Sequence, residues 1–356
     1  MSEPVRVLIV DDSSVVRQAL KNNLNTIPGI EVVGVAPDPF VARDMIMAKK
    51  PDVITLDIEM PRMDGMTFLR KLMKFYPVRT IIVSSLTQKG CDTALACLEA
   101  GAMGVVAKPA VAYSVGDMAA ELGRMIKDAA HHPVPEKRPD LDASSGKRLV
   151  APPSLASIET THKVIAIGTS TGGTEALRTV LSVLPKQTPG IIMTQHMPEG
   201  FTASFAARLN ELCEIEVREA KDGDSVLTGL ALLAPGNKHL HLARDGARYI
   251  VRVTDGPRVC RHKPSVEVLF ESTAEHAGRN AMGIIMTGMG NDGAQGLRTM
   301  RDAGAYTVAQ DKDSCVVFGM PREAIEKGGA ITVCPLTEIP NQIMNFAAGK
   351  LTAKAA

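Results

Sequence analysis

Five side chains that could bind a phosphoryl group follow short apolar segments in the first third of the chain. Asp11 and Asp12 follow the first segment, Asp57 a later one, and Ser84 and Lys108 end the next two. If these segments are neighbouring parallel strands, the five side chains meet at one edge of a sheet, where functional groups gather. Three close carboxylates repel one another unless a cation lies between them, and an all-oxygen site suits Mg²⁺. A lone Asp at a strand end is most often a helix cap, but the five together favour a phosphoryl-accepting site.

A second group of residues fits acyl chemistry. Ser170 lies in Gly168-Thr169-Ser170-Thr171-Gly172, directly after an apolar segment, and this matches the G-x-S-x-G pattern of a nucleophile elbow. The flanking glycines tolerate a sharp strand-to-helix turn that exposes the Ser170 hydroxyl. The helix that follows favours developing negative charge at its N-terminus. By itself the pattern is equally compatible with a phosphate-binding loop or a plain tight turn.

Two further residues favour the nucleophile over these alternatives. His196 follows the next apolar segment, and Asp292 follows a later one after the glycine-rich stretch 288–290. A serine, a histidine and an aspartate at one sheet edge are the parts of a nucleophile, a general base and an orienting carboxylate. Their order along the chain is Ser, His, Asp, whereas α/β-hydrolases have the order Ser, Asp, His. A common α/β-hydrolase domain is therefore disfavoured.

The elements that must position these residues form two α/β repeats. Short apolar runs alternate with helical spacing over residues 1–127, and the alternation resumes over 162–346. This pattern predicts two doubly wound parallel-sheet domains. Proline-rich residues 128–161 lack an apolar period and are expected to be a linker, and 347–356 a C-terminal tail. A hairpin is expected from 236–242 and 249–253.

Composition excludes several classes of protein. The chain has 356 residues, 45% hydrophobic content and a formal net charge of +1, so nothing indicates nucleic-acid binding or a charged membrane surface. No apolar run reaches the roughly 18 residues of a membrane span, and the N-terminus has no signal-peptide pattern. The 6 cysteines are scattered, as expected for free thiols in the cytoplasm. Cys260-Arg261-His262 could be half of a metal site, but the sequence offers no second half.

The first region resembles the receiver domain of bacterial response regulators. The similarity rests on Asp11-Asp12-Ser13, on residues 56–65 around Asp57, on Ser84-Ser85 and on Lys108-Pro109. It implies that Asp57 is the phosphoacceptor and that Asp11 and Asp12 help it to hold Mg²⁺. It also implies that Ser84 and Lys108 sense the phosphoryl group. Many receivers have an aromatic residue where this chain has Val105, so the resemblance does not extend to the aromatic residue of a rotamer switch.

The second region resembles the CheB family of chemotaxis protein-glutamate methylesterases. The similarity rests on residues 166–173, 194–198, 234–239 and 286–293. It implies that Ser170 is the nucleophile, His196 the base and Asp292 its orienting partner. It also makes the Met289 N–H an oxyanion donor and gives Thr171 an auxiliary role.

That family joins a receiver to a methylesterase domain, so the resemblance covers nearly the whole chain. It implies hydrolysis of glutamyl methyl esters, and deamidation of glutamines, on methyl-accepting chemoreceptors. The expected phosphodonor is the chemotaxis histidine kinase, and the esterase reaction itself is expected to need no cofactor. Neither nucleic acid nor membrane insertion is expected.

Arg258, His262 and residues 264–266 lie in another family-like segment, to which the sequence assigns no step. Two rival classes are a DNA-binding response regulator and a nucleotide-binding enzyme that uses residues 168–173.

Overall fold

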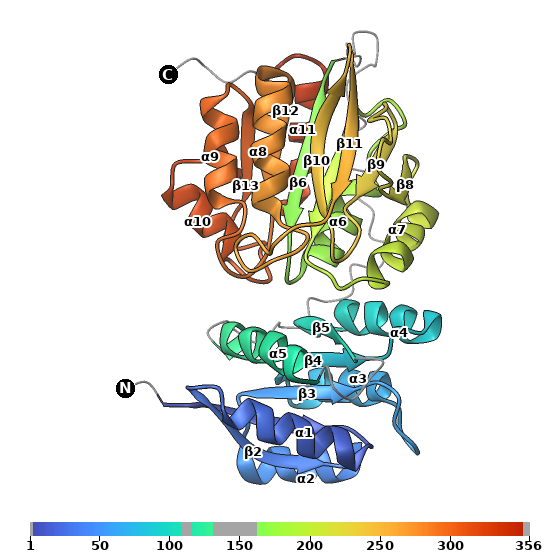
Figure 1. Ribbon diagram of the computed structural model, residues 1–356, viewed down its shortest axis with the longest axis vertical. Coiled ribbons are helices and arrows are strands. Elements are labelled where there is room, and N and C mark those ends of the chain that lie inside the picture. The colour runs from blue at the N-terminus through green and yellow to red at the C-terminus, as the bar shows by residue number, and fades with distance from the viewer. Residues whose placement is uncertain (1–2, 109–114, 131–161, 352–356) are drawn as a thin grey trace. The chain divides into compact units, whose positions relative to one another are not determined.

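Two parallel β-sheets form the framework of the chain in a computed structural model (Figure 1). The structure describes residues 3–108, 115–130 and 162–351. The chain divides into two compact units, residues 1–141 and 142–356. Most of the expected linker and the end of the expected tail lie outside the described residues.

The first unit is a five-stranded sheet with strand order β2-β1-β3-β4-β5, in which all pairs are parallel. Its elements are β1 (Val5–Val10), α1 (Ser14–Asn25), β2 (Ile30–Ala36), α2 (Pro39–Lys49), β3 (Val53–Asp57), α3 (Gly65–Phe75), β4 (Arg79–Ser84), α4 (Gln88–Glu99), β5 (Gly104–Ala107) and α5 (Val115–Ala130). Every residue of β3 is buried, because helices cover both faces of a parallel sheet. Helix α5 continues three residues beyond the expected boundary at residue 127.

The second unit is a seven-stranded parallel sheet with strand order β14-β13-β12-β6-β7-β9-β8. Its strands are β6 (Val164–Thr169), β7 (Gly190–Gln195), β8 (Glu216–Glu219), β9 (Leu230–Leu233), β12 (Ala281–Ile285), β13 (Tyr306–Gln310) and β14 (Thr332–Cys334). Its α-helices are α6 (Gly173–Leu181), α7 (Phe201–Leu212), α8 (Val266–Ala277), α9 (Ala294–Asp302), α10 (Met320–Glu326) and α11 (Ile339–Ala347). The first strand, β6, lies at the centre with β12 and β7 as neighbours, and this is where the strand order reverses. Ligands bind at such a switch point in doubly wound folds.

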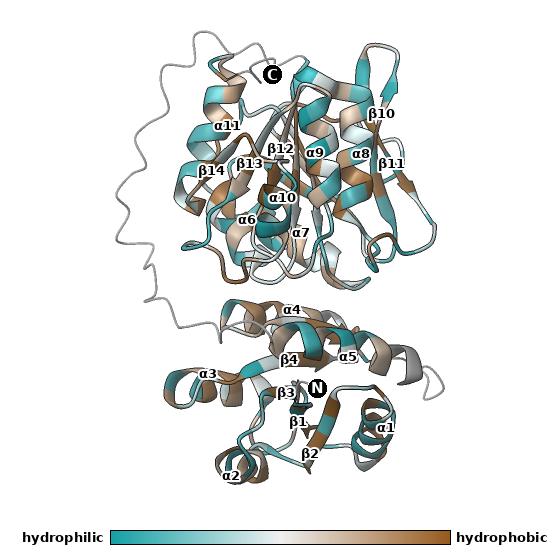
Figure 2. Cartoon of the chain, turned by 90° about the vertical axis from the view of Figure 1, so that its left-hand side faces the viewer, coloured by the Kyte–Doolittle hydropathy of each residue, from teal (hydrophilic) through white to brown (hydrophobic). Residues whose placement is uncertain are grey.

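Helices cover both faces of this second sheet, which confirms the predicted fold class. Helices α8 and α9 lie on one side of the strands, and α6 and α11 lie on the other (Figures 1 and 2). The core consists of apolar side chains from the central strands and from α8 and α9, including Ile192, Leu232, Phe270 and Leu297. Figure 2 shows that polar positions of these helices alternate with the hydrophobic ones. Among the described residues, no helix is both long and apolar enough to cross a bilayer.

The region between β7 and α8 differs in part from the pattern expected. The predicted hairpin is confirmed: β10 (His239–Asp245) pairs antiparallel with β11 (Arg248–Thr254). It packs on α8, where the Ser272 hydroxyl accepts a hydrogen bond from the Leu242 N–H at 3.1 Å. Strand β8, however, joins the parallel sheet beside β9. The short, partly exposed sequence of this edge strand resembles the alternation of a hairpin, so the pattern conceals its role.

Candidate active site and phosphorylation site

Ser170 occupies the turn between β6 and α6, as the elbow pattern predicts. It directly follows the last residue of β6, and Gly172, with φ 76°, forms the N-cap of α6. The Ser170 N–H donates to the Thr287 carbonyl at 3.1 Å, and the Ser170 carbonyl accepts from the Gly173 N–H at 2.8 Å. The turn is therefore fixed by backbone bonds on both sides of the nucleophile candidate.

A buried glutamine provides a further restraint on this turn that sequence reasoning missed. The Gln195 side-chain amide donates to the Ser170 carbonyl at 2.9 Å, and its oxygen accepts from the Thr169 hydroxyl at 2.6 Å. Gln195 is the last residue of β7 and pairs with Thr169 across the sheet. The only sign of this role in the sequence is a polar residue, Gln195, at the end of an apolar strand.

His196 and Asp292 form a buried polar contact. The His196 Nε2 lies 2.7 Å from the Asp292 Oδ2, with 8% of the histidine side chain and none of the aspartate exposed. The His196 N–H donates to the Thr169 carbonyl, which places His196 beside the Ser170 turn. Ser170 and His196 thus follow the ends of β6 and β7, and Asp292 lies in the loop after β12. These three strands are neighbours in the sheet.

Asp292 is an ionised carboxylate held by several donors. Burial alone would raise the pKa of Asp292, but hydrogen bonding to His196 and to residues 265–266 outweighs it and lowers that pKa. The Ser265 hydroxyl, at 2.7 Å, and the Glu267 N–H, at 3.0 Å, donate to the Oδ1. The Val266 N–H donates to the Oδ2 at 2.7 Å. Because Oδ2 also faces His196 Nε2, a neutral His196 carries its proton on Nε2 and its lone pair on Nδ1. That Nδ1 is buried and has no hydrogen-bond partner within the described residues.

The loop between β12 and α9 passes directly behind the nucleophile candidate. A Cβ on Gly288 would lie 2.8 Å from the Ser170 Cβ and 2.3 Å from the Met320 sulfur, so only glycine fits this approach. The Thr287 hydroxyl donates to the Thr171 carbonyl at 2.9 Å and ties the loop to the turn. Within the described part of the chain, neither the Met289 N–H nor the Thr171 N–H donates a hydrogen bond.

His262 contributes an aromatic contact to which the sequence assigned no step. Its ring stacks on the His196 ring with centroids 3.7 Å apart and an interplanar angle of 4°. The other family-like positions near His262 are Arg258 and residues 264–266, and they lie in different surroundings. Residues 265 and 266 bind Asp292, whereas the Arg258 side chain is exposed.

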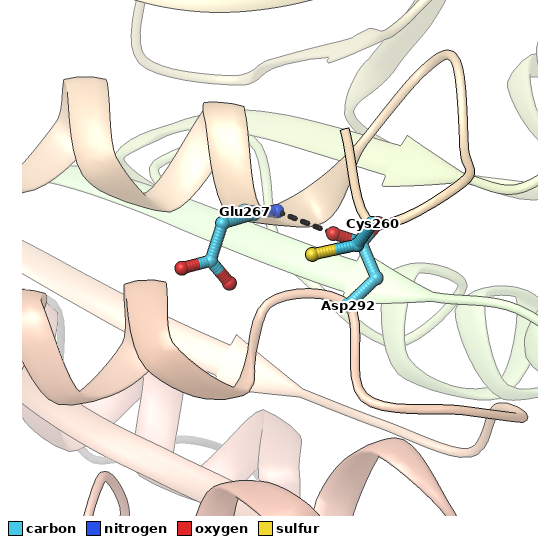
Figure 3. A group of neighbouring side chains, drawn as sticks. All are labelled: Cys260, Glu267 and Asp292. Carbon is cyan, nitrogen blue, oxygen red and sulfur yellow. Dashed lines mark hydrogen bonds between the residues drawn. The ribbon is translucent and has the colours of Figure 1, made fainter. Parts of the chain in front are cut away.

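Cys260, which the sequence suggested as part of a metal half-site, lies close to Glu267 and Asp292 (Figure 3). Their ligand atoms lie within 4.8 Å of one another. However, the Asp292 oxygens already accept the bonds described above, and the Glu267 carboxylate accepts from the Gly293 N–H at 3.0 Å. Burial and the nearby carboxylates raise the pKa of the Cys260 thiol to about 11, which disfavours the thiolate that a metal needs. This cluster therefore does not fit a metal ion.

The candidate phosphorylation site gathers at the carboxyl ends of β1, β3 and β5. The Lys108 Nζ lies 2.9 Å from the Asp11 Oδ2 and 2.7 Å from the Asp57 Oδ2. Burial raises the pKa of Asp57 to about 6, against the opposing effect of Lys108. Burial alone would lower the pKa of Lys108, but the charges of Asp57 and Asp11 outweigh it and raise that pKa.

The acidic cluster fits Mg²⁺ by the chemistry of its ligands. Carboxylate oxygens of Asp11, Asp12 and Asp57 all lie within 4.8 Å of one another, and hard oxygen ligands are those that Mg²⁺ prefers. Ser84 is at the end of β4 as expected, and its hydroxyl donates to the Gly90 carbonyl at 3.2 Å. Val105 is buried in β5 beside Ile82.

Comparisons with known proteins identify relatives for both units. A family model described as CheB methylesterase matches residues 165–343, and one described as response regulator receiver domain matches residues 7–116. A protein-glutamate methylesterase/protein-glutamine glutaminase from Anaeromyxobacter dehalogenans is 54% identical over 347 residues, covering 96% of this chain and 95% of its own. A relative of the same name from Salmonella typhimurium is 52% identical over 342 residues, covering 96% of each chain. The crystal structure of the Thermotoga maritima CheB methylesterase catalytic domain is 37% identical with a TM-score of 0.50, covering 51% of this chain and 97% of that one.

Proposed function

For a chain that belongs to the CheB methylesterase family and carries a receiver domain, we propose hydrolysis of glutamyl methyl esters on chemoreceptors. The same acyl chemistry would deamidate receptor glutamines, in keeping with the glutaminase activity in the relatives' names. The observation that carries the proposal is the buried His196–Asp292 pair beside the Ser170 turn.

The proposed mechanism proceeds through an acyl-enzyme. The Ser170 Oγ attacks the ester carbonyl while its proton passes to the His196 Nδ1. Asp292, bound to Nε2, holds the tautomer and stabilises the imidazolium that forms. The N–H groups of Met289 and Thr171 bind the oxyanion. The C–O bond to the methoxy group then breaks, and the leaving methoxide takes the proton from Nδ1 and departs as methanol. Water then attacks the acyl-enzyme with His196 as the base, which releases the glutamate and restores Ser170.

The receiver is proposed to regulate this reaction after phosphorylation of Asp57 by a chemotaxis histidine kinase. Asp11, Asp12 and Asp57 would hold Mg²⁺, which supplies positive charge to the phosphoryl group. Lys108 already contacts two of these carboxylates and would bind a phosphoryl oxygen in their place. Phosphorylation would convert the Asp57 carboxylate into an acyl phosphate, which adds negative charge and strong hydrogen-bond acceptors at this edge of the sheet. Labelling of the chain by a small phosphodonor should require Mg²⁺ and be lost in Asp57→Asn.

Methanol release from methylated receptor membranes tests the activity. The parent protein should release methanol, faster with a small phosphodonor, and Ser170→Ala should lower the rate by about 10³-fold or more. Ser182→Ala, at the C-cap of α6, is a matched control that should keep the parent rate. A Ser170→Ala protein within tenfold of the parent (about 1.4 kcal/mol) would rule out the serine mechanism.

A further inference from the structure

The stacked ring of His262 suggests how the plane of the His196 imidazole is fixed. The hydrogen bond from His196 Nε2 to Asp292 sets the tautomer and the direction of one ring nitrogen. A single hydrogen bond still allows the ring to turn about the line between its two atoms. The His262 ring, parallel at 3.7 Å, opposes that rotation because turning His196 would break the stack. Together the two contacts determine where Nδ1 points.

The backbone that carries His262 is held in an unusual conformation. Cys260 and Arg261 have φ values of 49° and 71°, in the left-handed region that non-glycine residues rarely adopt. The turn is closed by the His262 N–H donating to the Val259 carbonyl at 2.8 Å and by the reverse bond at 3.1 Å. Strained residues of this kind persist where the surrounding structure fixes them, and they cluster at functional sites.

The same segment also binds the carboxylate partner of His196. Three residues after His262, the Ser265 hydroxyl donates to Asp292, followed by the N–H groups of Val266 and Glu267. Residues 259–267 thus contact the His196–Asp292 pair at two places: the face of the imidazole and the oxygens of the aspartate. A displacement of the turn would move both contacts.

We propose that His262 is a positioning residue for the esterase reaction: its stacked ring holds the plane of His196 so that Nδ1, which has no hydrogen-bond partner among the described residues, is kept ready to accept the Ser170 proton. This inference rests on the proposed serine mechanism. His262 itself takes no proton from the substrate in this scheme.

His262→Ala and His262→Phe test the role of the stack in the full-length protein. Misplacing a reacting group can lower the rate about 10²-fold, so His262→Ala should lower kcat roughly 10- to 100-fold. KM should stay within about twofold, since a change in kcat alone marks an interaction needed for the chemical step. His262→Phe keeps a flat ring without nitrogens and should recover kcat to within about fivefold of the parent. His241→Ala is the matched control, because His241 hydrogen-bonds to Thr254 in the β10–β11 hairpin.

Each result of this comparison supports or contradicts the positioning role. A parent-like kcat in His262→Ala, with Ser170→Ala inactive, overturns the positioning role and leaves the serine mechanism intact. A His262→Phe protein that is folded but as slow as His262→Ala overturns it too, because the ring nitrogens would then be what matters. If His262→Ala does not fold, the kcat of His262→Phe alone decides. An active Ser170→Ala protein contradicts the serine mechanism, and this inference with it.

Discussion

At the scale of single residues, His196 uses the opposite nitrogens from the familiar protease arrangement. In serine proteases the aspartate binds Nδ1 and Nε2 takes the proton. Here Asp292 binds Nε2, and the buried Nδ1 has no hydrogen-bond partner among the described residues, so Nδ1 is the nitrogen that the proposed mechanism uses. Nδ1 lies closer to the backbone than Nε2, so the position of the β7 end controls the base directly. The bond from His196 N–H to Thr169 then links the base to the nucleophile turn through the main chain.

His196→Ala and Asp292→Asn should each slow methanol release by at least about 10²-fold, and the double variant should be little slower than His196→Ala. Residues that act as one unit are strongly non-additive, because removing either disables the same step. Initial rates at saturating substrate, with thermal unfolding of each variant as a control for folding, measure the effect. Losses that multiply in the double variant would show that the two residues do not share one proton relay.

Asp57→Asn should stabilise the chain at neutral pH. Burial raises the Asp57 pKa to about 6, so the folded state binds this proton more tightly than the unfolded state does. The ionised carboxylate therefore costs stability above pH 6, and this cost disappears as the pH falls from about 6 to about 4. The asparagine variant avoids the cost, which is at most about 3 kcal/mol.

Chemical or thermal unfolding of full-length Asp57→Asn without Mg²⁺ checks this expectation. The gain in stability over the parent should be full near pH 7.5 and should vanish near pH 4. Asp44→Asn, an exposed acidic residue paired with its neighbour Arg43, is the control and should show little change. A gain that grows as the pH falls would contradict the direction of the pKa shift.

At the scale of elements, the loop after β12 unites the active site. It supplies Asp292, includes the Met289 N–H, which donates no hydrogen bond among the described residues, and passes so close to Ser170 that residue 288 has no room for a side chain. Its position is fixed by Thr287, whose hydroxyl donates to Thr171, and by Glu267, which accepts from Gly293. The geometry of the oxyanion site therefore depends on how closely this loop approaches the β6–α6 turn.

Gly288→Ala should lower kcat by about 10²-fold, because the added Cβ must push the Ser170 turn away from the loop. The added Cβ would lie 2.3 Å from the Met320 sulfur, on a flexible side chain, and 2.8 Å and 3.0 Å from the Ser170 Cβ and nitrogen, which can move only with the turn. Gly256→Ala is the control, since a Cβ there meets only His239 at 3.6 Å. Methanol release by both proteins provides the measurement. A Gly288→Ala enzyme with the parent rate would mean that the turn tolerates the displacement.

At the scale of the whole molecule, two parallel sheets each carry one candidate site. Each site gathers at the carboxyl edge of its own sheet, around Asp57 in the first unit and Ser170 in the second. The second unit has its own core, and the catalytic domain of the Thermotoga maritima relative forms a structure by itself. The receiver is therefore expected to act as a regulator of an enzyme that is already complete.

A fragment that starts near residue 156 should be more active than the unphosphorylated full-length chain. We expect the receiver to restrict access to Ser170, with a coupling of about 1 to 3 kcal/mol, or roughly 5- to 150-fold in rate. The initial rate of methanol release by the fragment and by the full-length protein, without phosphodonor, decides the matter. Equal rates would mean that the receiver does not mask the esterase, and that phosphorylation acts instead by recruiting the enzyme to its receptor.

The residue types of both sites could be found from the sequence because each follows a local signal. A run of buried apolar residues ends at a polar one, as at Asp57, Ser170 and His196, and parallel strands bring such ends to one edge. The fold class follows from the same alternation. Strand β8 escaped prediction because an edge strand is only partly buried, so its pattern resembles that of a hairpin.

Only the tertiary structure decided how these side chains face one another. The choice of Nε2 for Asp292, the stack of His262 on His196, and the Ser84 hydroxyl turned toward Gly90 depend on contacts between distant segments. Sequence spacing determines the edge of the sheet at which a residue lies, because strand and helix periods are local. It does not determine ring planes or hydrogen-bond partners, because these are set by the packing of helices and loops from other parts of the chain.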